Sequence, residues 1–191
     1  MRPGPWRRDR IGRSGARSIM TNTPATPSKR NFVLQQGFDD PAAEVCATRY
    51  DALQFQPRAV GVVVAVGIVL QSATVFLLLA AVLAWSAARP RRNPFDAVYN
   101  VVRGARDDRR RLPPAPPPRR FAQSLAALVA ALIALSLLAS WREATIALQG
   151  FLAAAVLALA AGRFCFGSFV FHLLRGRGEF ARRTLPWSGR G

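Results

Sequence analysis

The chain has 191 residues, of which 51% are hydrophobic, and carries a formal net charge of +17. This combination is unusual for a soluble globular domain and typical of a small multi-pass membrane protein with basic ends. The arginines flank apolar runs instead of gathering on one soluble face, which disfavours nucleic-acid binding. With two cysteines and one histidine, the sequence excludes a disulfide framework and a four-cysteine zinc site, and we expect no metal and no cofactor.

Residues 1–30 are rich in arginine and lack the apolar core of a secretory signal peptide. We expect this basic N-terminal segment to be disordered. Met20 offers a second candidate start, which would make residues 1–19 an upstream extension.

A soluble lead-in follows over residues 31–58. Within it, Asp40 and Pro41 match the N-cap and first position of a short helix that extends to about Leu53. Pro57 is expected to end the lead-in.

The first charge-free run covers residues 59–88. A single helix of this length would measure about 45 Å at 1.5 Å per residue, longer than the ~30 Å hydrocarbon core of a bilayer. The run is therefore either one long helix or a hairpin of two short helices. Basic segments flank it on both sides, and such segments stay cytoplasmic. Only a hairpin keeps both on one side, so the charge pattern favours the hairpin.

The second half contains a clearer hairpin. Residues 121–140 form a full-length apolar span, residues 141–143 a tight turn, and residues 144–162 the return span. Trp85 and Trp141 lie near predicted membrane interfaces, where aromatic residues concentrate.

Each hairpin is followed by a short amphipathic segment. In each, four apolar residues recur at helical spacing and share one face: Phe95, Val98, Tyr99 and Val102 in the first, and Phe166, Phe169, Val170 and Leu173 in the second. Both segments are too short to span a bilayer, so we expect them to lie at the cytoplasmic interface with arginines toward anionic headgroups. Residues 59–104 and 121–176 would then be two copies of one unit.

These elements predict an all-α fold with four transmembrane helices in two hairpins, each followed by an interfacial helix. Residues 105–120 would form an arginine- and proline-rich cytoplasmic linker, and residues 177–191 a basic C-terminal tail. Both termini would lie in the cytoplasm and the chain in the inner membrane.

Small residues repeat at every fourth position on both helices of the second hairpin: Ala122, Ala126, Ala130 and Ala134 on the first, and Gly150, Ala154, Ala158 and Gly162 on the second. Such stripes let helix backbones approach closely in lipid. We expect the two stripes to face each other, and they make a homo-oligomer or a membrane-protein partner plausible.

Cys165 is the one candidate for chemistry, because Cys165-Phe166-Gly167-Ser168 has the spacing of a redox pair with serine in the last position. Arg163 and a helix start would favour its thiolate. The alternative, which we prefer, is an inert buried side chain. His172, on the more polar side of its segment, could titrate near neutral pH.

Other polar residues carry weaker signals. Arg58, Arg120 and Arg163 end predicted spans on the cytoplasmic side and could bind an anion together, although most membrane proteins place arginines there. Glutamines are the polar side chains expected to face the protein interior, and they are Gln71, Gln123 and Gln149. No carboxylate lies in a predicted span, which disfavours an ion-coupled transporter.

Three short motifs resemble an uncharacterised bacterial membrane family known as domain of unknown function 4395. They are Asn93-Pro94-Phe95, Arg120-Phe121-Ala122-Gln123 and Phe164-Cys165-Phe166-Gly167, and the resemblance covers roughly residues 31–187. It implies a four-helix integral membrane protein and no established activity. Members commonly have a second cysteine where this chain has Ser168, which puts dithiol chemistry in doubt here.

Three functions follow as hypotheses. The first is a non-enzymatic scaffold or partner subunit of the cytoplasmic membrane. The second is a thiol- or sulfur-handling membrane protein that uses Cys165. The third is a conduit for a small solute or anion between the two hairpins.

Overall fold

The computed structural model describes residues 27–38, 43–104 and 113–188, and within these ranges every regular element is a helix. The predicted all-α fold is confirmed. The candidate start at Met20, the N-cap at Asp40 and the first half of the linker, residues 105–112, lie outside the described residues. Helix α1 (Pro27–Gln35) begins inside the segment expected to be disordered. It is held there because Phe32 and Val33 are buried and Asn31 donates to the carbonyl of Leu185 at 3.1 Å.

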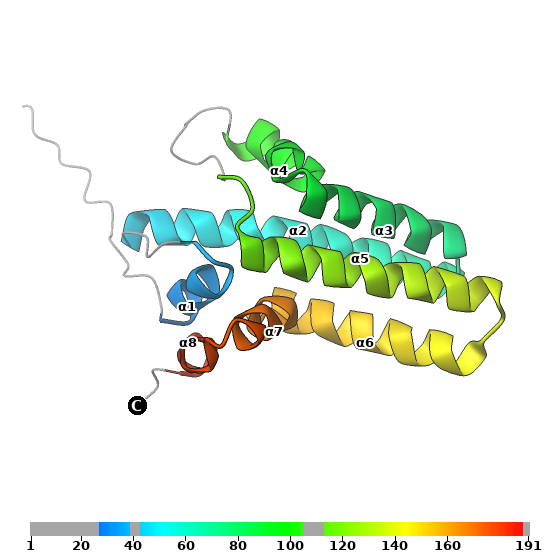
Figure 1. The fold of residues 1–191 in the computed structure, drawn as a ribbon. Helices are drawn as coiled ribbons and strands as arrows, with labels where there is room; N and C mark the ends of the chain where they lie inside the picture. The colour runs from blue at the N-terminus through cyan, green and yellow to red at the C-terminus, as the bar shows by residue number, and fades with distance from the viewer. Residues whose placement is uncertain (1–26, 39–42, 105–112, 189–191) are drawn as a thin grey trace, which may run out of the picture.

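Four apolar helices lie side by side and form the body of the protein (Figure 1). They are α2 (Ala43–Leu70), α3 (Ala73–Ala88), α5 (Pro117–Leu138) and α6 (Arg142–Ala160). Both tight turns, α2–α3 and α5–α6, lie at one end of this bundle, and the short helices lie at the other (Figure 1). The bundle therefore has a turn end and a short-helix end.

The first charge-free run is two helices and not one. The break falls at Gln71, whose φ of 45° is left-handed, and at Ser72, whose hydroxyl accepts from the backbone N–H of Val75 as the N-cap of α3. Three helical segments are long and apolar enough to cross a membrane: Arg49–Leu70, Pro117–Leu138 and Arg142–Ala160. Helix α3 is apolar but has only 16 residues, about 24 Å at 1.5 Å per residue.

The second part of the lead-in, from residue 43 on, and the first span are one continuous helix, so the prediction that Pro57 ends the lead-in is wrong. Pro57 lies inside α2. An internal proline removes one backbone hydrogen bond and costs about 3 kcal/mol. Burial on both sides of it compensates, since Leu53, Gln54 and Val60 are all buried.

The main core lies between the four apolar helices and is built from Val64, Phe76, Leu83, Ile133 and Leu152 with smaller residues around them. A second cluster joins α1 to the first part of α2 through Phe32, Val33, Cys46, Tyr50 and Leu53.

The small-residue stripes do not face each other as predicted. Ala130 and Ala134 are buried in the core, but Gly150 and Ala154 of α6 are exposed, and Gly162 lies in the exposed turn that follows α6. The stripe on α6 therefore faces outward. The spacing of small residues at every fourth position does not indicate which neighbouring helix that face contacts.

The short helices close the other end of the bundle. A 3₁₀ turn (Pro90–Arg92), α4 (Pro94–Tyr99) and a π turn (Asn100–Gly104) follow α3, while α7 (Phe166–Leu174) and α8 (Gly178–Arg183) follow α6. Their polar and small residues face inward: Asp96 in α4, and Gly167, Ser168 and His172 in α7. Val98, Val102 and Leu173 are exposed, so part of each predicted apolar face points away from the protein.

Candidate functional site

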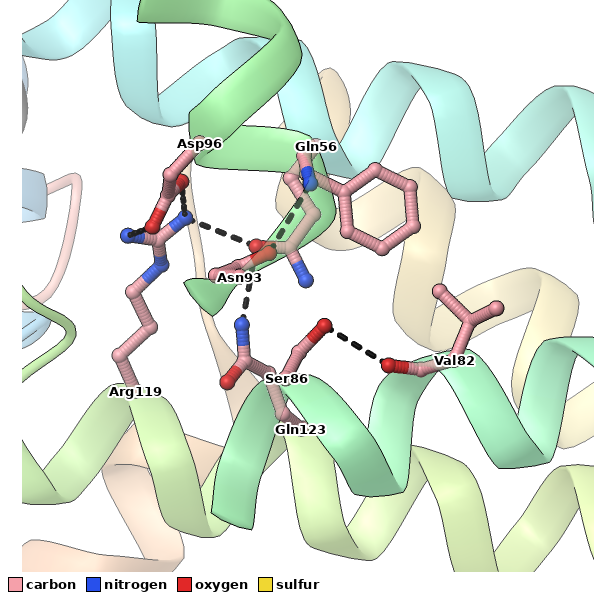
Figure 2. Close-up of polar contacts among 8 residues, drawn as sticks. Gln56, Val82, Ser86, Asn93, Asp96, Arg119 and Gln123 are labelled. Carbon is pink, nitrogen blue, oxygen red and sulfur yellow. Dashed lines mark hydrogen bonds and ion pairs between the residues drawn. The ribbon is translucent and has the colours of Figure 1, made fainter. Parts of the chain in front are cut away.

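A buried ion pair links α4 to the first turn of α5 (Figure 2). The guanidinium of Arg119 donates to the carboxylate of Asp96 through two nitrogens, at 3.1 Å and 2.6 Å. The side chains are only 5% and 11% exposed. Paired nitrogens and oxygens in this planar arrangement give the strongest kind of side-chain hydrogen bonding. The charges of the two residues offset each other inside the protein.

Two glutamines extend the pair into a four-residue polar cluster. Gln56 of α2 accepts hydrogen bonds at its Oε1 from Arg119 at 2.8 Å and from Gln123 at 3.0 Å. Both glutamines are buried. The cluster of Gln56, Asp96, Arg119 and Gln123 therefore joins α2, α4 and α5, as Figure 2 shows.

Arg119 fixes the orientation of both amides. A guanidinium has donors only, so Gln56 must turn its oxygen toward Arg119. Gln123 must then offer its NH₂ group to that same oxygen, which points its own Oε1 away. This Oε1 is buried and has no hydrogen-bond partner within the described residues.

Asn93 sets the position of α4. Its side-chain oxygen accepts from the backbone N–H of Phe95 at 3.0 Å, which caps the helix, and Pro94 occupies the first helical position. The cap starts the helix where Asp96 falls in the first turn and faces inward. Nearby on α3, Ser86 donates to the carbonyl of Val82 at 2.7 Å (Figure 2).

A partly open cavity of about 90 Å³ adjoins this polar cluster. Gln56, Arg119 and Gln123 contribute to its polar end. Most of the remaining wall is apolar and comes from α2, α3, α5 and α6, including Val60, Leu83, Ala126, Val156 and Leu159. Cys165 also lines it. The cavity lies in the half of the bundle next to the short helices.

Cys165, the candidate predicted for chemistry, is buried at the start of α7. Its backbone N–H donates to the side-chain oxygen of Gln35 at 3.0 Å. Arg163, which was expected to favour its thiolate, instead donates to the hydroxyl of Tyr50 at 3.0 Å and to Ser28 at 3.4 Å. Arg163 therefore ties the end of α6 to α1 and α2.

His172 is buried, because the more polar side of its segment, on which the sequence places it, faces the protein interior. Its Nε2 lies 3.2 Å from the carbonyl oxygen of Gln35 and must donate to it, so that Nδ1 carries no proton when the ring is neutral. Nδ1 is buried without a hydrogen-bond partner in the described part of the chain. Burial lowers the pKa of His172, and the charge of Arg177 lowers it further, while the bond to Gln35 opposes both effects. The neutral ring is therefore favoured near pH 7.

The structure gives each predicted anion-binding arginine a separate setting. Arg58 is exposed, Arg120 donates to the carbonyl of Ala87 at 2.8 Å, and Arg163 bonds Tyr50. Within the described ranges, no group of three or more His, Cys, Asp or Glu residues could hold a metal ion.

Two of the three glutamines that were predicted to face the protein interior do so. Gln123 and Gln149 are buried. Gln71 is exposed at the α2–α3 turn, contrary to the prediction, and its amide donates to Gln149 at 3.3 Å, which links this turn to α6.

The sequence analysis missed the Asp96–Arg119 pair. Asp96 did carry a signal, because it lies between arginine clusters, two residues after Pro94 of an Asn-Pro cap. Its partner lies 23 residues away across a proline-rich segment, so spacing alone could not identify it.

Comparison with known proteins gives one family. The family model described as domain of unknown function (DUF4395) matches residues 51–176, which is most of the chain. No curated protein and no solved structure matches the chain. The matched segment runs from the middle of α2 through α7 and contains the polar cluster and Cys165. The chain belongs to the DUF4395 family, whose activity is unknown.

Proposed function

We propose that the chain is a four-span protein of the cytoplasmic membrane that acts as a non-enzymatic, self-associating subunit. The observation that carries the proposal is the outward-facing stripe on α6. Only 17% of the most apolar segment of α6 is buried within the protein, against 39% of the corresponding segment in each of the other two candidate spans. An apolar helix with so little buried surface needs lipid or another helix to cover it.

The stripe favours another helix. A Cβ built on Gly150 would meet nothing within 4 Å, and Ala154 is exposed on the same helix. Small residues at this spacing let two backbones approach closely in lipid, where packing drives association. A second copy of this chain is the partner we propose.

The distribution of arginine supports two hairpins with both termini in the cytoplasm. Arg142 lies at the turn end of the bundle, whereas Arg89, Arg92, Arg175 and Arg182 lie at the short-helix end, to which the described end of the chain also belongs (Figure 1). Helix α3 would cross with Trp85 and Arg89 near one interface, where the guanidinium lies 5.9 Å from the ring centroid. A short span of this kind is accommodated by local thinning of the bilayer and by flanking residues that extend to the interface.

The alternatives have less support. A separate cavity at the turn end is lined by Gln71 and Gln149, among other residues. The fully buried core residues Phe76, Ala130 and Ile133 lie between it and the cavity beside the polar cluster, which disfavours a conduit through one chain. Burial of Cys165 disfavours exchange with bulk thiols.

Cysteine cross-linking tests the proposal. In a Cys46→Ala, Cys165→Ala background, Ala154→Cys should give a disulfide-linked dimer in oxidised membranes. Leu78→Cys, an exposed position on α3, is the control and should cross-link far less. Adding Gly150→Leu should remove the Ala154 cross-link. Equal cross-linking at both sites, or none at Ala154, would contradict self-association through α6.

A further inference from the structure

We propose that the cavity beside the polar cluster binds a small, uncharged amphipathic molecule with a hydroxyl head group and an apolar tail. The hydroxyl would donate to Oε1 of Gln123, and the tail would lie against α2, α5 and α6. This site is independent of self-association through the outer face of α6.

The hydrogen-bond acceptor of this site is Oε1 of Gln123. Gln123 is 5% exposed, and its Oε1 is buried without a partner in the described protein. The hydrogen bonds from Arg119 to Gln56 and from Gln123 to Gln56 exclude the flipped amide, so this atom is an acceptor. A buried acceptor left unpaired is destabilising, because it has lost its hydrogen bonds to water. A ligand that donates to it recovers part of this loss.

The charge at the polar end of the cavity bears on the choice of head group. Arg119 lines the cavity, but Asp96 already neutralises it through two hydrogen bonds. An anionic head would compete with Asp96, and a cationic head would lie against the guanidinium. The polar end therefore favours an uncharged head group.

The apolar tail would lie in a neighbouring cavity. A second cavity of about 80 Å³ shares Ala122, Ala126, Val156, Leu159 and Cys165 with the first and continues along α5 and α6 toward Phe151. Both are partly open, so an apolar chain could enter from the bilayer. Water suits the second cavity poorly, because a buried water needs two to four polar partners and the lining of this cavity is apolar.

Photo-crosslinking in phosphatidylcholine nanodiscs tests the site with the full-length chain. The probes are decanol carrying a diazirine and decane carrying the same diazirine, with unlabelled decanol as competitor. We expect the alcohol probe to label peptides that contain Ala126, Val156 or Cys165, in a manner that decanol competes away. The alkane probe should label the same peptides at most weakly. Equal labelling by the two probes, or labelling that decanol does not displace, would overturn the proposal.

Variants test the acceptor and the space separately. Gln123→Leu should weaken decanol competition about three- to tenfold, the loss expected for one hydrogen bond. Gln149→Leu removes another buried glutamine, at the turn end, and should leave competition unchanged. Ala126→Phe fills the shared wall and should abolish labelling while it leaves the polar cluster intact. Thermal unfolding verifies that each variant folds, and unchanged competition in Gln123→Leu would exclude the proposed contact.

Discussion

Arg119 at the start of α5 donates two hydrogen bonds to the carboxylate of Asp96 in α4, and almost no solvent reaches either side chain. This pair holds the helix that ends the first hairpin against the helix that begins the second. Gln56 adds α2 through its bond to Arg119. The two hairpins are thus joined by polar contacts at the short-helix end and by apolar packing along their length.

Breaking the pair should destabilise the protein strongly. We expect Arg119→Met or Asp96→Leu to lower the free energy of unfolding by about 3–5 kcal/mol, because each leaves a buried charge without its partner. The double variant Asp96→Leu, Arg119→Met should recover much of that loss. Denaturant unfolding in detergent, followed by circular dichroism, measures all three variants. Additive losses in the double variant would show that the pair does not act as a unit.

A glycine allows α7 to approach α5 closely. A Cβ added at Gly167 would lie 2.7 Å from the Cα of Ala122, a backbone atom that cannot move aside cheaply. We expect Gly167→Ala to destabilise the protein by about 1–3 kcal/mol, the usual cost of overpacking. The matched control is Gly150→Ala on α6, where the added Cβ meets nothing within 4 Å. That variant should be neutral or more stable by up to about 1 kcal/mol, because alanine is the better helix former.

Stability should depend on pH through His172. The ordinary pKa of 6.5 applies to the unfolded chain, and burial lowers the pKa in the folded protein. Below pH 6.5 the unfolded state then binds more protons than the folded state, so stability is complete above that pH and is lost as the pH falls below it. Unfolding of wild type and His172→Gln across pH 5–8 measures this effect. The glutamine variant should lose less stability on acidification, and parallel curves would contradict the assignment.

The sequence predicted the positions of the helices better than it predicted which helices pack against one another. Charge-free runs and arginine clusters located α3, α5 and α6, because these features act locally. The passage of α2 through Pro57 depended on burial against other helices. The pairing of Asp96 with Arg119 depended on how α4 packs against α5. Such tertiary relationships leave no periodic trace in a single sequence.

The membrane crossing of α3 is the part of the account on which the two-hairpin arrangement depends. Single cysteines at Gln71, Arg92 and Glu143 test it in the Cys46→Ala, Cys165→Ala background, since all three residues are exposed. Cysteine at position 71 adds no new type of backbone strain, because glutamine already adopts the left-handed conformation there. Labelling with a membrane-impermeant maleimide in right-side-out and inverted vesicles should place Gln71→Cys on the same side as Glu143→Cys and opposite Arg92→Cys. Labelling of Gln71→Cys from the same side as Arg92→Cys would show that α3 does not cross.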